Sequence, residues 1–461
     1  MNEHPLANAV RPSACPGLLR IVPALDGGIC RIKLAGGVIS ADQARAVAQA
    51  AARYAGGVIE ATNRANLQIR GIGAAHQALI DSLLAAGLGP APAGAEPAMG
   101  REPATGTEVS RVSGADDVRN LMLSPGAGID SRMLIDTRPL AAQILASLQG
   151  RARFHELSAK FAIQLDGGEA LAMLEHPHDL WLSALSIENR PCLAFGLAGC
   201  PAADAPLAAV PLEHGHALVV AVLELFLDLA RPEQTRMRHL LAEMSSAAFL
   251  AQLAERLGFT PLAVGDWRRA PATDGLHVGT YPQRQPGLVH VGAVFPLGRL
   301  DTAMLEGVAQ LAQQYGDGNL RLTPWQSLLL PGIRQEQASQ VSARLQQLGL
   351  LCDADQPLAR IIACTGSAGC AKGQADTKAD ARRLATLLPV PALAVHLSGC
   401  QRSCAAAHVA PATLLAVGPG RYDLYFRDAA QPGFGLLHAR NLTIDAAGAL
   451  LEARSRSSTD D

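Results

Sequence analysis

The spacing of apolar residues predicts the same helix–strand unit twice in this chain. Residues 37–72 align without a gap onto residues 298–333, at a constant offset of 261 positions. In each copy a capping residue, Ser40 or Asp301, precedes apolar residues at helical spacing, and Gln43 completes a capping box in the first copy. Glycines end each predicted helix, and a short apolar strand follows. The match indicates an internal duplication.

A weaker repeat links two further pairs of segments. Residues 118–124 align with 359–365, and the strand-like residues 163–167 align with 395–399. In this alignment, four clustered cysteines of the second copy fall opposite residues without a thiol: Leu123, Ile129, Gly168 and Ala172. We therefore expect one metal-cluster domain and one degenerate twin.

Two segments predict joints between the repeated units. Residues 89–107 are rich in Pro, Ala and Gly and predict a linker or surface loop. The charged residues 231–239 predict a hinge between the two halves, and the tail from Ser455 is predicted to be disordered.

Composition and charge exclude several partners. Apolar residues make up 49% of the 461 residues, and the formal charge of −2 provides no field for nucleic acid or an anionic membrane. The opening residues lack the basic and apolar regions of a signal peptide. The apolar stretch 217–230 is too short to span a bilayer and predicts a buried helix. We expect a cytoplasmic monomer with no nucleic-acid or membrane partner.

Four of the nine cysteines form a pattern, and the odd total argues against a disulfide framework. Cys364 and Cys370 enclose five residues, and Cys400 and Cys404 enclose three. This spacing differs from that of zinc hairpins, whereas four thiolates are the usual ligands of a [4Fe–4S] cluster. Gly399 leaves room for such a cluster beside Cys400. We predict that these four cysteines hold it, with a zinc site or four reduced thiols as the alternatives.

The motif Cys-Thr-Gly-x3-Cys followed by Gly-Cys-x3-Cys resembles the cluster motif of the sirohaem-dependent nitrite and sulfite reductases. In that superfamily the last cysteine also bridges the cluster to the sirohaem iron, a role that would fall to Cys404. The resemblance implies an α+β fold with a duplicated nitrite/sulfite-reductase-like architecture. It comprises two ferredoxin-like half-domains at 1–88 and 275–350 and two α/β cluster-type domains at 104–230 and 351–454, of which the C-terminal one carries the cluster.

Three cations match the superfamily's anion-binding residues. Arg64 resembles the arginine of its Thr-x-Arg-Gln segment, Arg119 that of its Arg-Asn pair, and Lys160 the lysine of its Lys-Phe-Lys or Lys-x-Asn element. The resemblance implies catalytic and substrate-binding roles for all three, against the alternative of ordinary surface residues. The fourth polar position of the superfamily falls on Ala162, which is a departure. Weaker substrate-binding candidates come from the repeated segments: Arg70, Arg321 and Gln326.

The precorrin-3B synthases, a branch of this superfamily, resemble the chain in residues 11–17, in Asp26-Gly27-Gly28 and in compact length. The resemblance implies hydroxylation of precorrin-3A at C20 with dioxygen and closure of a γ-lactone. It also implies an electron donor, either NADH-linked or a reductase, and a second, mononuclear non-haem iron. Possible iron ligands lie in three short pairs: His155-Glu156, His176-x-His178 and His214-x-His216.

Two other functions stay open at this stage. A sirohaem-dependent nitrite or sulfite reductase would retain sirohaem as a cofactor, and Ala162 argues against it. An electron-transfer or redox-sensing module without catalysis would need neither the large duplicated scaffold nor the three cations.

Overall fold

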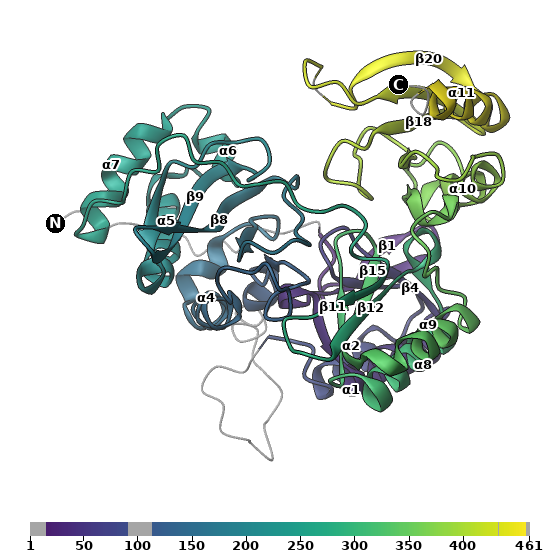
Figure 1. Ribbon diagram of the computed structural model, residues 1–461, viewed down its shortest axis with the longest axis horizontal. Coiled ribbons are helices and arrows are strands. Elements are labelled where there is room, and N and C mark those ends of the chain that lie inside the picture. The colour runs from purple at the N-terminus through teal and green to yellow at the C-terminus, as the bar shows by residue number, and fades with distance from the viewer. Residues whose placement is uncertain (1–14, 91–112, 432, 458–461) are drawn as a thin grey trace.

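The computed structural model describes residues 15–90, 113–431 and 433–457, and it contains four five-stranded sheets (Figure 1). Most of the linker at 89–107 lies outside these residues. The prediction of a disordered tail from Ser455 is wrong as far as residue 457, because α11 (Ile444–Ser457) continues through it. None of the described helices is long and apolar enough to cross a membrane.

Two of the sheets form ferredoxin-like halves with the same strand order. The first contains, in spatial order, β1 (Val22–Ala24), β2 (Gly27–Ile32), β5 (Leu67–Ile72), β4 (Val58–Ala61) and β13 (Arg299–Leu300). The second contains β11 (Gly279–Pro282), β12 (Leu288–Val294), β15 (Ser327–Arg334), β14 (Asn319–Leu322) and β3 (Val38–Ser40). Their helices gather on one side in Figure 1: α1 (Ala41–Tyr54), α2 (His76–Ala85), α8 (Thr302–Tyr315) and α9 (Ala338–Gln347).

The two halves exchange their edge strands. β13 comes from the second half and pairs with β4 of the first, while β3 comes from the first half and pairs with β14 of the second. A single apolar core therefore runs through both halves and includes Ile32, Leu67, Leu328 and Val341. Neither sheet is complete without the other half.

Unusual backbone angles recur at corresponding positions of the two halves and confirm the duplication. Gly37 and its twin Gly298 have φ of +73° and +69°, and Ala65 and its twin Gln326 have φ of +55° and +57°. Left-handed backbone is uncommon outside glycine, so its recurrence at twin positions reflects one inherited turn. The capping box at Ser40 is also confirmed, because Ser40 and Gln43 bond each other's backbone N–H groups.

The cluster-type domains share a second topology. In spatial order, one contains β10 (Ala208–Pro211), β9 (Arg190–Gly199), β8 (His178–Ile187), β7 (Ile163–Asp166) and β6 (Leu121–Leu123). The other contains β20 (Leu436–Leu442), β19 (Arg421–Phe426), β18 (Ala412–Gly418), β17 (Val395–Ser398) and β16 (Ile361–Ala363). In each, three parallel strands precede two antiparallel ones. The predicted α+β architecture is confirmed.

Strand register corrects part of the sequence alignment between these domains. Leu121 pairs with Ile163, and Ile361 pairs with Val395, so the twin of Cys364 is Ser124 and not Leu123. The alignment was one position off because neither three-residue strand carries a distinctive pattern. One backbone hydrogen bond recurs at the corrected register, from Asp130 to Gly126 and from Cys370 to Gly366. The twin of Cys370 is therefore Asp130 and not Ile129.

Helices complete the cluster-type domains. They are α4 (Arg138–Gly150), α5 (Gly215–Leu229), α6 (Met237–Leu240) and α7 (Ser246–Leu257) in the first domain, and α10 (Thr377–Ala385) with α11 in the second. The predicted buried helix at 217–230 is confirmed by α5. Met237 and Leu240 are buried in the core of the first domain, so this unit continues past the proposed hinge at 231–239.

A buried carboxylate joins three of these units. Glu60 on β4 accepts hydrogen bonds from Arg299 on the exchanged strand β13 (2.8 Å) and from the Thr365 hydroxyl of the cluster domain (3.1 Å). Lys378 Nζ and Arg70 Nη1 lie 3.7 and 3.8 Å from its oxygens. Burial acts to raise the pKa of Glu60, but Lys378, Arg70 and Arg299 outweigh it and hold the pKa below its usual value.

We expect Glu60→Gln to weaken the assembly by about 3–5 kcal/mol, because it leaves buried cations without their counter-charge. Guanidinium titration of the cluster-loaded protein should show a lower unfolding midpoint. The pKa of Glu60 is lower in the folded protein than in the unfolded chain. Its contribution to the free energy of unfolding is therefore fully present above pH ~4.3 and is lost as the pH falls through the pKa of the folded state. Asp445→Asn, which breaks an exposed pair with Arg383, is the matched control and should change the midpoint little. Equal midpoints for both variants would contradict the prediction.

Candidate functional site

The four cysteines come together at one edge of the fourth sheet. Cys364 follows β16 and Cys400 follows β17, and these parallel neighbours end at the same edge. Cys370 follows the short helix η7 (Gly366–Ala368), and Cys404 lies one turn of loop beyond Cys400. The pKa of Cys404 is raised by burial and then by the charges of Cys400, Cys364 and Cys370, which places all four thiols near one another.

Glycines let the two cysteine loops approach closely. The Gly399 N–H donates to Cys364 Sγ at 3.2 Å. A Cβ atom on Gly399 would lie 3.2 Å from that sulfur and 3.4 Å from the Cα atoms of Gly366 and Gly373. No three His, Cys, Asp or Glu side chains surround a single-ion position within the described residues. Four converging thiols with an amide donor fit a four-iron cluster instead, since each cysteine there binds a different iron.

Arg70 fixes the first cysteine loop. Its Nη2 donates to the carbonyl of Gly369, next to Cys370, at 3.1 Å, and to Asp26 Oδ1 at 2.8 Å. The Arg70 side chain is 5% exposed. The structure therefore gives Arg70, a weaker substrate-binding candidate from the sequence, a supporting role beneath the cluster loop.

Arg64 is a partly buried cation without a hydrogen-bond or ion-pair partner for its guanidinium among the described residues. It lies in the turn between β4 and β5, and its guanidinium makes no hydrogen bond or ion pair with the residues that the structure describes. Burial lowers its pKa to about 10, and the neighbouring charge of Arg236 adds to this shift. Asp179 does not neutralise Arg64, because it holds Arg236 with two contacts of 2.9 Å. Arg64 is thus available to an anionic ligand.

Arg31 is a second cation near the cysteines, and it was missed in the sequence. Burial lowers its pKa, while Cys15 and Cys404 lie close enough to act on it in the opposite direction. The charge of Arg31 also acts on Arg64 and contributes to lowering its pKa. The sequence feature that could have identified Arg31 is the alternation of apolar and polar residues along β2. Cys30 and Ile32 point into the core, and Arg31 points to the opposite face.

Neither Arg119 nor Lys160 forms a hydrogen bond with Arg64 among the described residues. The Arg119 guanidinium is occupied internally: it donates to Asp116 and to the carbonyl of Leu88 at 2.8 Å each and to the carbonyl of Gly89 at 3.1 Å. Lys160 is exposed in the turn before β7. Both remain candidates on resemblance, but neither side chain meets Arg64 in an observed contact.

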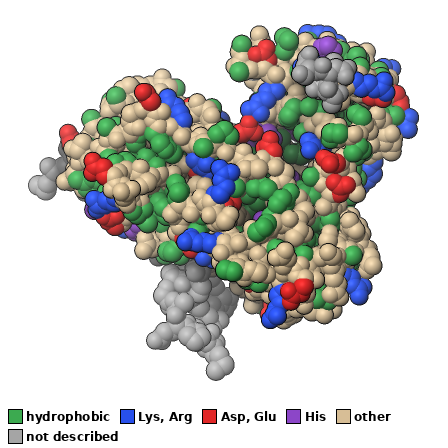
Figure 2. Space-filling view, viewed as in Figure 1, with side chains coloured by type: hydrophobic (Ala, Val, Ile, Leu, Met, Phe, Trp, Pro, Cys, Tyr) green, Lys and Arg blue, Asp and Glu red, His purple; other side chains and the backbone are tan. Residues whose placement is uncertain are grey.

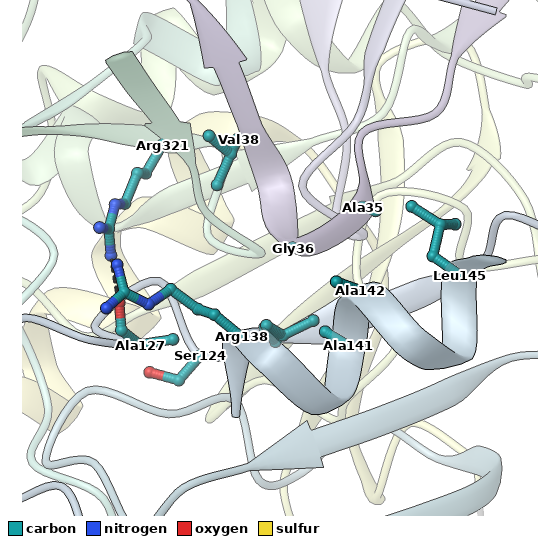
Figure 3. Close-up of a pocket in the computed structure, with 11 residues that line it drawn as sticks. Ala35, Gly36, Val38, Ser124, Ala127, Arg138, Ala141, Ala142, Leu145 and Arg321 are labelled. Carbon is teal, nitrogen blue, oxygen red and sulfur yellow. Dashed lines mark hydrogen bonds between the residues drawn. The ribbon is translucent and has the colours of Figure 1, made fainter. Parts of the chain in front are cut away.

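Arg321 joins the second ferredoxin-like half to the degenerate domain, whereas Gln326 lies within the second half. Arg321, the twin of Glu60, donates to the carbonyls of Pro125 and Ala127 at 2.9 and 2.7 Å. Together with Arg138 it lines a 270 Å³ cavity between the ferredoxin-like halves and the degenerate domain, and none of the four cysteines lines this cavity (Figure 3). The side chain of Gln326 packs on Gly298, in the inherited turn.

The histidines of all three candidate pairs have structural partners; in the third pair, His178 Nδ1 bonds the carbonyl of His176 at 2.8 Å. His155 Nε2 bonds the carbonyl of Gln149, and His216 Nε2 bonds Ser147 Oγ, both at 2.9 Å. The ring of His214 packs against Phe259 in a tilted arrangement, with centroids 4.6 Å apart. The remaining pair, His176 and His178, lies where the two cluster-type domains meet.

Comparisons with known proteins agree with this architecture. The family described as "Nitrite/Sulfite reductase ferredoxin-like half domain" matches residues 23–87 and 281–348. The family described as "Nitrite and sulphite reductase 4Fe-4S domain" matches residues 114–260, the copy without the cysteine motif. Two ferredoxin-like halves around one four-thiol site define a redox protein. The chain belongs to the nitrite/sulfite reductase family and is an oxidoreductase.

Relatives of two kinds are similar to the chain. It is 30% identical to the ferredoxin–nitrite reductases of Zea mays and Synechococcus elongatus, covering 68% and 76% of those proteins and 82% and 84% of this chain. It is 28% identical to a precorrin-3B synthase of Sinorhizobium sp, over 92% of this chain and 84% of that enzyme. The chain thus spans about two thirds of the maize enzyme and more of the Sinorhizobium one. The structure of Mycobacterium tuberculosis NirA shares the fold, with a TM-score of 0.71 over 93% of this chain and 80% of NirA at 21% identity.

We expect Cys364→Ser, Cys370→Ser, Cys400→Ser and Cys404→Ser each to lose most of the cluster, because a cube with one missing thiolate is exposed to solvent and to oxidation. Protein purified without oxygen should contain about four sulfides per chain, with at least as many irons. Acid-labile sulfide and iron analysis measures both. Cys352→Ser is the control, since its thiol contacts the Ser342 carbonyl instead. Stoichiometric zinc without sulfide would contradict the assignment.

Proposed function

We propose that this protein is a precorrin-3B synthase-like monooxygenase of aerobic corrin biosynthesis. It hydroxylates precorrin-3A at C20 with dioxygen and forms the γ-lactone. One oxygen atom enters the product and the other leaves as water, with two electrons and two protons from an external donor. The cofactors in this proposal are a [4Fe–4S] cluster on Cys364, Cys370, Cys400 and Cys404 and a mononuclear non-haem iron.

The observation that carries the proposal is the incomplete set of donors for a small anion. The fourth polar position of the reductases is Ala162, which is 2% exposed and whose N–H is bound by Asp179. Arg119 is held by internal partners, and Lys160 is exposed. Reduction of nitrite or sulfite needs several donors aimed at one small ligand, and loss of one such donor costs about 3 kcal/mol of transition-state stabilisation. A polycarboxylate macrocycle instead needs cations spread along its edge.

The length of the relatives gives further support. The similarity to the Sinorhizobium precorrin-3B synthase covers 84% of that enzyme, whereas the similarity to the maize nitrite reductase covers 68%. In this proposal Arg64 and Arg31 bind carboxylates of the macrocycle. The partly buried position of Arg64 strengthens that contact, because water competes less there than at an exposed site.

A sirohaem-dependent nitrite or sulfite reductase is the second candidate. It is favoured by the 30% identity to the plant and cyanobacterial nitrite reductases. In that case sirohaem would occupy the place of the precorrin, and Cys404 would bridge it to the cluster.

Incubation with precorrin-3A, a reductant and ¹⁸O₂ should give a product one oxygen atom heavier than the substrate, with the label in the hydroxyl. Mass spectrometry measures the incorporation. The same preparation should show neither sirohaem absorption nor turnover of nitrite or sulfite with reduced viologen. Label from water, or robust reduction of either anion, would transfer the assignment to the alternatives.

We expect Arg64→Ala to weaken precorrin binding about 10–100-fold, since a hydrogen bond to a charged group is worth about 1.5–3 kcal/mol. An absorption titration measures the affinity, and sulfide analysis should show an intact cluster. Arg344→Ala on the exposed side of α9 is the control and should bind normally. Unchanged affinity in Arg64→Ala would remove this residue from the substrate site.

A further inference from the structure

Arg321 on β14 is a buried cation that has no ion pair with the described residues. It is 6% exposed, and burial lowers its pKa, while Asp317 and Asp136 oppose this shift only from beyond ion-pair distance. Among the described residues, the other arginines that are at most 9% exposed, Arg70 and Arg119, are each paired with an aspartate. Taking a charge out of water is costly unless a partner of opposite sign offsets it. Arg321 therefore favours a negatively charged partner from outside the chain.

The twin position in the first half shows how the chain provides for such a charge. Glu60 corresponds to Arg321 in the duplication, and three cations lie within 4 Å of its oxygens: Arg299, Arg70 and Lys378. At Arg321 the sign of the charge is reversed, but no carboxylate of the described residues takes the place of those cations. The second copy thus keeps a buried charge and lacks internal neutralisation for it.

One edge of the Arg321 guanidinium is free. Nη1 donates to two backbone carbonyls, whereas Nε is buried without a hydrogen-bond partner and Nη2 makes no hydrogen bond with the described residues. With this same Nε–Nη2 edge, Arg70 binds Asp26 and Arg269 binds Asp166, at distances of 2.6 to 3.1 Å. Two parallel hydrogen bonds of this kind are typical of arginine–carboxylate recognition. The free edge of Arg321 has the geometry to bind a carboxylate.

The cavity that Arg321 lines has mostly apolar walls. Val38 begins β3, Leu123 ends β6, and Leu145 lies on α4, so three units of the fold contribute to it. In Figure 3 the guanidinium groups of Arg321 and Arg138 lie at one end, and Leu145 lies at the other. An apolar cavity with a few polar groups at one end is typical of a small-molecule site.

A glycine makes room for the second guanidinium at the cavity. Gly128 has a φ of +78°, and a Cβ atom there would lie 2.0 Å from Cζ of Arg138. Arg138 also forms an ion pair with Asp136, with Nη2 and Oδ2 2.6 Å apart. Because Asp136 neutralises Arg138, the unpaired charge at the cavity is that of Arg321. A single carboxylate matches this charge.

The size of the cavity limits the length of the apolar chain. Its volume of 270 Å³ lies below the range of about 300–1,000 Å³ for drug-sized ligands and equals about nine water molecules of about 30 Å³ each. Figure 2 shows Lys and Arg side chains interspersed with Asp and Glu on the visible face, so anion selection depends on local contacts and not on a broad basic field.

We propose that this cavity binds a small monocarboxylic acid with a short apolar chain. The carboxylate accepts two hydrogen bonds from the Nε–Nη2 edge of Arg321, and the chain lies against Val38 and Leu145. None of the four cysteines lines the cavity, and the inference does not depend on the proposed function. A molecule bound there contacts both ferredoxin-like halves and the degenerate domain, so its binding stabilises their assembly.

Titration calorimetry of the cluster-loaded protein with hexanoate, in the absence of tetrapyrrole, tests the proposal. Hexanoate should bind saturably at one site per chain, and the unfolding temperature should rise with its concentration. Two probes separate charge from chain: 1-hexanol has the chain without the charge, and inorganic phosphate has charge without the chain. Each should bind at least about 10-fold more weakly than hexanoate, since each lacks one of the two contacts.

Two variants address the two parts of the site. Arg321→Gln should weaken hexanoate binding about 10–100-fold, because it removes the two-point contact with the carboxylate. This variant also changes the bonds to two backbone carbonyls, so Ala141→Leu provides a test that keeps Arg321. Ala141 lines the cavity from α4 and is 8% exposed, and the larger side chain should occupy the cavity and weaken hexanoate binding at least about 10-fold without lowering the unfolding temperature of the free protein.

Matched controls carry the same kinds of change elsewhere. Ala146→Leu makes the same substitution at an exposed position of α4 that does not line the cavity, and it should bind hexanoate normally. Arg64→Ala removes a cation of the other site and should also bind normally. The absence of saturable hexanoate binding, retained affinity in either Arg321→Gln or Ala141→Leu, or loss of binding in Arg64→Ala would overturn the proposal. Equal affinity for 1-hexanol or for phosphate would overturn it as well.

Discussion

The position of the redox site depends on one buried carboxylate. Moving a charge from water into the protein costs several kcal/mol, and the cost is offset only where partners surround it. For Glu60 these partners are Arg299 from the exchanged strand, Arg70 from the adjacent strand, and Thr365 and Lys378 from the cluster domain. A shift of any of these units would leave a charge unpaired. The interaction therefore fixes the cysteine loops relative to the face of the sheet that carries Arg31.

The duplication accounts for the paired sheets of the fold. The residues that differ between the two copies account for the presence of four clustered thiols in one copy. Arg31 and Gln68 on the first sheet correspond to Gly292 and Leu329 on the second, and Glu60 corresponds to Arg321. Each ferredoxin-like sheet faces one cluster-type domain, but only the first presents charge to four thiols. In the degenerate domain Asp130 replaces Cys370, and its carboxylate accepts hydrogen bonds from two backbone N–H groups where the other copy would hold a metal. The four-thiol site is thus present in the C-terminal cluster-type domain and absent from the corresponding described residues of the degenerate domain.

Local signals in the sequence were sufficient for much of the fold. The cap at Ser40 and the helix at 217–230 depend on neighbouring residues, and each is present. The strand exchange could not be predicted, because β3 and β13 are very short and their partners lie far away in the chain. The four cysteines were identifiable from spacing. The internal partners of Arg119 were not, since the carbonyls of Leu88 and Gly89 carry no side-chain signal.

The exchanged strands also affect how the chain must be made. On the ribosome, β4 emerges long before β13, its neighbour at the sheet edge, so that edge stays open while roughly 240 residues are added. At about 5–20 residues per second this wait lasts on the order of tens of seconds. An unpaired strand edge is a site of aggregation. During synthesis the first half therefore depends on protection from outside the chain, or on delayed folding, until its own second half arrives to close the sheet.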